Sequence, residues 1–437
     1  MNAELRSLRT EAETALAESF AAARNSLPGS ATVKAARERA FAAFEGKGLP
    51  HRRTEPWRYT DLRALLRTVP PRAAGAAAAT ALPADPLPGL DRARIVVVDG
   101  VWRPELSDLA GLDGVTVTAT ERLLAEGDER LGGQAGRLDD AMVALNTALM
   151  AGGVAIDVPA GVDINRAVEI AHVTTGAVAT YVRNHIWVGA GGSLRVLETF
   201  VGADAAYQAN VVTEAVIGDR AKVIWAKLQA EAASSVHIGT LAASIGAEAQ
   251  FDHLTLMTGA ALSRSQSFVS FGGEFARAGL FGATMVGGRQ HADIMLGVDH
   301  AVPNGASREL FKAVMDGRAE GIFQGRIVVR PGAQKTDGRM MTQGLLLSEE
   351  ATFSVKPELE IFADDVQCAH GATSGQIDED MLFYLLARGI PRAEAETLLV
   401  TAFLAEAIEG LGDEAIGEAF EVVARDWLAR RGRTVAP

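Results

Sequence analysis

Cys368 is the only cysteine of the 437-residue chain, and His370 follows it two positions later. If the run is one extended strand, these side chains share a face with Asp364 and Val366. A thiol beside an imidazole can form a two-ligand site for a soft metal or become an activated thiolate. A closed zinc site or an iron–sulfur cluster normally needs four protein ligands. The pair therefore looks like half of a site, and a buried, inert cysteine beside a hydrogen-bonded histidine is the alternative.

A second group of candidate ligands contains His291, Asp293 and His300. His291 and Asp293 would share one face of a strand, but no further ligand lies within reach in the sequence. We expect them to be hydrogen-bonded residues of the fold. The sequence contains no G-x-x-x-x-G-K-[ST] loop, no G-x-S-x-G elbow, no H-E-x-x-H and no C-x-x-C. We therefore expect no enzymatic activity, and any nucleotide hydrolysis must come from a partner.

The composition excludes several classes of protein. Hydrophobic residues make up 48% and charged residues 22% of the chain, which is typical of a globular protein. A net charge of −13 argues against nucleic acid or an anionic membrane as the main partner. One cysteine cannot form an intrachain disulfide, and no apolar run approaches the ~18 residues of a membrane span. We expect a cytoplasmic protein.

A glycine-led pattern recurs in the middle of the chain. Its four copies are Gly191-Gly-Ser-Leu-Arg-Val196, Gly218-Asp-Arg-Ala-Lys-Val223, Gly246-Ala-Glu-Ala-Gln-Phe251 and Gly273-Glu-Phe-Ala-Arg-Ala278. Their spacings are 27, 28 and 27 residues. A glycine turn followed by a short strand at a fixed period favours a stacked solenoid. A β-sandwich is the alternative, although its turns would drift more in spacing.

Helical patterns occupy both ends of the chain. Ser30 and Asp378 are predicted to cap helices, and Gly389 is predicted to follow the end of one. Trp57 and Tyr59 are expected to anchor a proline-broken segment onto the next domain. The predicted domains are an N-terminal helical domain (1–66), a linker with mixed α/β segments (67–153), a β-helix core (154–373) and a C-terminal helical domain (374–437).

Several longer segments resemble the SufB/SufD family, the scaffold components of the Suf iron–sulfur cluster assembly machinery. They are Phe323–Val329, Gly332–Asp337, Leu345–Leu347, Lys356–Thr373 and Leu382–Ile390, together with Glu55–Leu62 near the N-terminus. The similarity is continuous from about residue 291 to residue 404. The Cys-x-His-Gly-Ala-Thr motif and the absence of a thiol at 348–353 are similar to the SufD branch of the family.

The resemblance implies a right-handed parallel β-helix, mainly β, flanked by helical N- and C-terminal domains. It also implies pairing with a SufB-like subunit through the β-helix and docking of a SufC-like ATPase on the C-terminal helices. The complex in this family is described as one SufB, one SufD and two SufC subunits. An isolated chain of this kind can form a homodimer through the surface that SufB would occupy.

His370 and Cys368 match family positions proposed to lie at the SufB–SufD interface and to help form the nascent cluster. The resemblance therefore implies an incomplete metal site whose other ligands come from the partner. Iron or a cluster would be transient there and not tightly bound by this chain alone. ATP binding by the SufC subunits would twist the pair and expose these groups.

Two readings from other classes stay open. A solenoid could act on polysaccharides, but this needs paired carboxylates, and Asp364 and Asp365 would point to opposite faces of a strand. The second reading is a purely structural homodimer in which Cys368 is inert. Thiol labelling of the native protein tests this second reading, because an inert core cysteine reacts only after unfolding.

Overall fold

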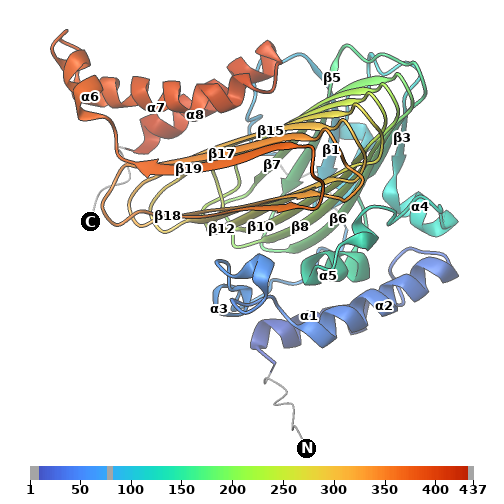
Figure 1. Cartoon of the computed structure of the whole chain (residues 1–437). Coiled ribbons are helices and arrows are strands. Elements are labelled where there is room, and N and C mark those ends of the chain that lie inside the picture. Colours follow the sequence, from blue (N-terminus) through green and yellow to red (C-terminus); the bar gives the residue numbers. More distant parts are fainter. Residues whose placement is uncertain (1–8, 76–81, 432–437) are drawn as a thin grey trace, which may run out of the picture.

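The computed structural model describes residues 9–75 and 82–431. Parts of the predicted N-terminal helical domain (1–66), of the linker (67–153) and of the C-terminal helical domain (374–437) lie outside these residues. The chain forms a parallel β-solenoid from two facing sheets, with helices at both ends of the sequence (Figure 1). Among the described residues, no helix has the length and apolar character that crossing a membrane requires.

Within the described residues, one sheet has ten strands and the other nine. The ten-stranded sheet runs in the order β19 (Gln367–Gly375), β17 (Asp337–Leu346), β15 (Ala306–Met315), β13 (Arg277–Val286), β11 (Gln250–Met257), β9 (Lys222–Gln229), β7 (Ser193–Gly202), β5 (Ala167–Thr174), β1 (Arg92–Val98) and β2 (Val101–Trp102). The nine-stranded sheet runs in the order β18 (Thr352–Ile361), β16 (Glu320–Val329), β14 (His291–His300), β12 (Leu262–Phe271), β10 (Val236–Ile245), β8 (Gln208–Ile217), β6 (Ala179–Val188), β4 (Val154–Val158) and β3 (Thr116–Ala119).

The four repeated glycines lie in turns that carry the chain from the nine-stranded to the ten-stranded sheet. A Cβ added to Gly218 would lie 2.8 Å from the backbone N of Ala190, and one added to Gly273 would lie 1.9 Å from that of Ala247. Glycine is therefore required because turns of successive rungs stack backbone against backbone. The predicted solenoid is confirmed. The sandwich is wrong, because the long strands pair in parallel. Among the strand pairs that the structure describes, only β1–β2 and β3–β4 are antiparallel.

Helices cover the outer faces of both sheets (Figure 1). On the nine-stranded sheet lies α5 (Ala141–Leu149), and α1 (Glu11–Ala23) and α2 (Ala31–Lys47) pack against α5. α3 (Leu62–Leu65) belongs to the same apolar cluster, and α4 (Thr120–Glu126) follows β3. The ten-stranded sheet is covered by α7 (Arg392–Glu409) and α8 (Glu414–Arg431), which follow α6 (Glu379–Leu386). Short 3-10 helices span Glu55–Trp57, Pro104–Leu106 and Ala135–Arg137.

The predicted helix ends are confirmed. Ser30 Oγ accepts a hydrogen bond from the N–H of Val33 at the start of α2. Asp378 caps α6 in the same way through the N–H groups of Asp380 and Met381. Gly389 lies just beyond α6 with φ +82°, in the left-handed region that glycine favours.

The proline-broken segment after α2 is held on the nine-stranded sheet, as predicted for Trp57. The Trp57 side chain is buried, and its indole N–H donates to Asp140 Oδ2 at 2.9 Å. The Arg264 guanidinium lies 3.9 Å from the centre of the Trp57 ring and donates to the Pro56 carbonyl. Arg264 lies on β12. The segment 55–62, called the strap below, therefore joins the N-terminal helices to the solenoid.

The solenoid is open at its C-terminal end. Strands β18 and β19 are the outermost strands of their sheets, and each has a strand partner on one side only among the described residues. Ile361 and Phe362, at the end of β18, are 42% and 59% exposed. This end therefore presents two free backbone edges with apolar side chains beside them.

Candidate functional site

Cys368 and His370 lie on β19, the free edge of the ten-stranded sheet. Their partners on β17 are Gly338 and Met340, and Met340 is buried in the solenoid core. The two side chains therefore share the inward face of the strand, at the open end. The sequence placed Asp364 and Val366 on the same strand, but both lie in the turn between β18 and β19. That part of the prediction is wrong, because the run from Lys356 turns a corner of the solenoid.

The Cys368 thiol is half-buried against the solenoid core. Burial raises its pKa, and the negative charges of Asp337 and Glu309 raise it further, against a hydrogen bond from the Gly338 N–H. The thiol is thus protonated at neutral pH in this chain alone, which is the opposite of an activated thiolate. Cysteine binds a metal as the thiolate, so metal binding here would release a proton.

His370 is exposed on the edge strand, next to this thiol. Its neighbour Gly371 has no side chain, and a Cβ there would lie 2.8 Å from Cε of Met341. Within residues 9–75 and 82–431, no three His, Cys, Asp or Glu side chains group closely enough to hold a metal ion. The pair has two candidate ligands facing an open edge, so a complete site would need groups from another molecule.

Glu309 is a nearby functional candidate that the sequence reasoning missed. It lies on β15 in the column of inward side chains that continues through Met340 to His370. Glu309 is only 2% exposed, and neither of its carboxylate oxygens has a hydrogen bond of normal geometry. Burial raises its pKa to about 8. The alternation of strand residues could have indicated an acid at an inward position, but only once the register was known.

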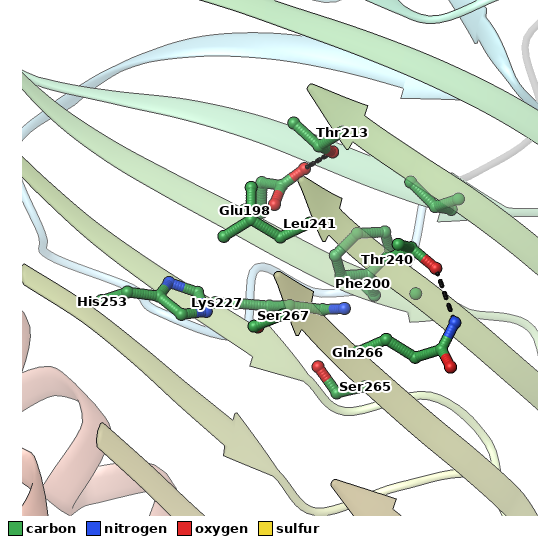
Figure 2. A pocket seen from close by; sticks show the side chains of 12 residues that line it. Glu198, Phe200, Thr213, Lys227, Thr240, Leu241, His253, Ser265, Gln266 and Ser267 are labelled. Atoms are coloured by element: carbon green, nitrogen blue, oxygen red, sulfur yellow. Dashed lines mark hydrogen bonds between the residues drawn. The ribbon is translucent and has the colours of Figure 1, made fainter. Parts of the chain in front are cut away.

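A larger polar cluster lies deep inside the solenoid (Figure 2). The Lys227 ammonium is 3.1 Å from His237 Nε2, and Glu231 Oε2 is 2.7 Å from the other nitrogen of that ring. Burial lowers the pKa of Lys227 and raises that of Glu198. The enclosed cavity beside Lys227 measures about 10 Å³, which is room for at most one water molecule. The side chains of this cluster therefore bond to one another inside the fold, and they do not form a ligand pocket.

His291 and Asp293 are hydrogen-bonded residues of the fold, as expected. Thr60 Oγ1 lies 2.9 Å from His291 Nε2 and also donates to Asp293, so the two side chains bind the N-terminal strap. His300 points inward, stacks on Phe271 with ring centres 4.1 Å apart, and shares a hydrogen bond with Ser307 Oγ. None of the three residues lies with Cys368 and His370.

The fold and this pair define a class: a parallel β-solenoid with a thiol and an imidazole on the free edge strand at its open end. Two family models match the chain, "SUF system FeS cluster assembly, SufBD core domain" over residues 171–403 and "SufBD protein N-terminal region" over residues 10–170. The chain belongs to the SufBD family. The resemblance seen in the sequence is thereby confirmed.

Three relatives agree with this assignment. The iron–sulfur cluster assembly protein SufD of Escherichia coli is 31% identical over 398 residues, which cover 86% of this chain and 88% of that protein. An iron–sulfur cluster assembly SufBD family protein of Synechocystis is 30% identical over 379 residues, 83% of each chain. SufD of Bacillus subtilis is 27% identical over 286 residues, 63% of this chain and 64% of that protein.

Proposed function

We propose that the chain is a non-catalytic, cytoplasmic scaffold subunit of a Suf iron–sulfur cluster assembly complex. It pairs through its open end with a SufB-like subunit and docks a SufC-like ATPase on its C-terminal helices. Iron and sulfide are the cargo of this site, and no cofactor is bound tightly by this chain alone. The observation that carries the proposal is the thiol–imidazole pair on the unpaired edge strand β19.

The open end supports pairing with a second β-solenoid. Its two edge strands carry unpaired backbone groups, which another chain can satisfy by continuing the sheets. Such pairing would bring the partner's side chains to the inward face where Cys368 and His370 lie. The missing ligands of the half-site would then come from the partner.

The C-terminal helices support docking of a further subunit. Met381, Phe383 and Tyr384 of α6 are 58%, 71% and 56% exposed, and Leu398 of α7 is 48% exposed. Large apolar side chains that gather on one surface mark an interaction site. α7 and α8 bury their other faces on the solenoid, so this surface is held rigidly by the scaffold.

Replacing His370 by Ala tests the proposal. In the complex co-expressed with the neighbouring SufB- and SufC-like chains, His370→Ala should abolish cluster formation because one of the two ligands is lost. Visible absorbance and bound iron and sulfide measure the cluster, and native mass measurement should show unchanged subunit assembly.

Gln367→Ala is the matched control, since Gln367 lies exposed on the same strand and pairs in register with Asp337. It should leave cluster yield unchanged. Full cluster yield in the His370→Ala complex would show that the proposed site is wrong.

A further inference from the structure

A basic segment stands out in this acidic protein. Residues 51–72 contain six arginines and two acidic residues, a net charge of +4 in a chain whose total is −13. Arg52 and Arg53 lie in the turn after α2, and both side chains are exposed. Neither side chain has a hydrogen bond or ion pair with a described residue. Their positive charge is thus uncompensated within the described molecule.

These arginines line a surface cavity of about 400 Å³. Its wall is formed by Thr10, His51, Arg52, Arg53, Asp61, Arg63 and Ala64. The Arg63 guanidinium is held in place by an ion pair with the buried Glu13 carboxylate, whose Oε2 lies 3.6 Å from Arg63 NH2. Asp61 is held too, because it caps the N–H of Ala64 at the start of α3. The cavity therefore combines two side chains held in place, Asp61 and Arg63, with the two unpaired guanidinium groups of Arg52 and Arg53.

The composition of the wall indicates the class of ligand. Pockets for small organic molecules are mostly apolar and aromatic, whereas Ala64 is the only apolar residue in this wall. Arginine forks bind carboxylates in two-point contacts. A long polyanion such as nucleic acid would be repelled by the rest of the protein, and Trp57 is buried and offers no stacking face. A short run of carboxylates fits best.

The surface lies away from the C-terminal helices. α3 packs with α1, α2 and α5 on the nine-stranded sheet, whereas α7 and α8 cover the other sheet (Figure 1). The contact between the Arg264 guanidinium and the Trp57 ring fixes the segment to the solenoid. A partner bound at the arginines would leave the C-terminal helices free.

We propose that Arg52 and Arg53 form a docking surface for an acidic segment of a partner protein, a segment rich in Glu and Asp. This inference goes beyond the proposed function and does not depend on it. The association would be electrostatic, so it would weaken as salt is added and would respond mainly to charge and less to the order of the acidic residues.

A fluorescein-labelled decaglutamate peptide tests the surface by anisotropy with the full-length chain. Arg52→Glu/Arg53→Glu should weaken binding by at least about tenfold, and the neutral Arg52→Gln/Arg53→Gln should weaken it less. Arg277→Glu/Arg289→Glu is the control, because it makes the same charge change at two exposed arginines elsewhere on the solenoid, at the start of β13 and in the turn after it. It should bind like the unaltered chain.

Three outcomes would overturn the inference. The unaltered chain could fail to bind the peptide at low salt, or the control could lose as much affinity as the Arg52/Arg53 variant. A ten-nucleotide single-stranded DNA could also bind more tightly than the peptide and depend on the same arginines, which would assign the surface to nucleic acid. Unchanged thermal unfolding of all variants verifies that the fold is intact.

Discussion

At the scale of single residues, Glu309 shows what a carboxyl in the solenoid interior costs. Its pKa of about 8 in the folded chain lies far above its ordinary value of 4.5. The folded state therefore holds a proton that the unfolded state loses above about pH 4.5. Stability from this proton is complete below that pH and falls as the pH rises toward 8.

Glu309→Gln removes this titration. Because one pKa unit corresponds to about 1.4 kcal/mol, the difference between the variant and the unaltered chain should change by a few kcal/mol between pH 5 and pH 8, in favour of the variant at pH 8. Urea unfolding at a series of pH values measures it. Parallel pH curves for the two proteins would contradict the assigned burial. Glu349→Gln, at an exposed carboxylate in the turn between β17 and β18, is the control and should leave the curve unchanged.

At the scale of elements, the strap over the nine-stranded sheet depends on one buried ion pair. Arg264 and Asp293 are both fully buried and bonded to each other. Arg264→Met should cost about 3–5 kcal/mol in the free energy of unfolding, because it leaves the Asp293 charge unpaired. Residues 55–62 should then become accessible to trypsin at Arg58, since the ring contact with Trp57 is also lost.

The double variant Arg264→Met/Asp293→Leu removes both charges, so it separates the cost of the unpaired charge from the cost of lost packing. It should recover part of the free energy of unfolding that Arg264→Met loses. Arg330→Met is the control. Its partner Asp299 is bonded at 2.9 Å but the arginine is exposed, so the cost should stay below about 1 kcal/mol. Equal losses in Arg264→Met and Arg330→Met would contradict the role of the buried pair.

Elements also show how far the sequence can predict. The helices were predictable because their ends carry local signals, as at Ser30 and Asp378. The full length of the strands is harder to predict: β6 runs from Ala179 to Val188, and its middle is polar and not apolar. Its polar residues Arg183 and Asn184 are buried by contacts with α5 and with other strands, which a local pattern cannot show. The thiol–imidazole pair was found because two-residue spacing is local, whereas Glu309 joins it only through the register of β15, β17 and β19.

At the scale of the whole molecule, the open end predicts the oligomeric state of the isolated chain. We expect a homodimer joined at β18 and β19. The pair Ile361→Glu/Phe362→Glu should give the mass of a single chain in light scattering, because it places charge on the apolar rim of that end. Phe275→Glu is a close control: Phe275 is 58% exposed and lies in a turn far from the open end.

The Phe275→Glu control should stay dimeric. A dimer that survives the double substitution at the open end would assign the contact to another surface. A monomeric unaltered chain at micromolar concentration would rule out the homodimer.

The open end at β18 and β19 has a consequence for how much of the protein a cell should make. Unpaired strand edges recruit whatever strand they meet, and long exposed edges promote aggregation. With the proposed pairing, a subunit made in excess of its partner keeps this edge uncovered. Surplus copies must therefore pair with each other, be degraded or aggregate, and balanced synthesis of the two chains protects against all three outcomes.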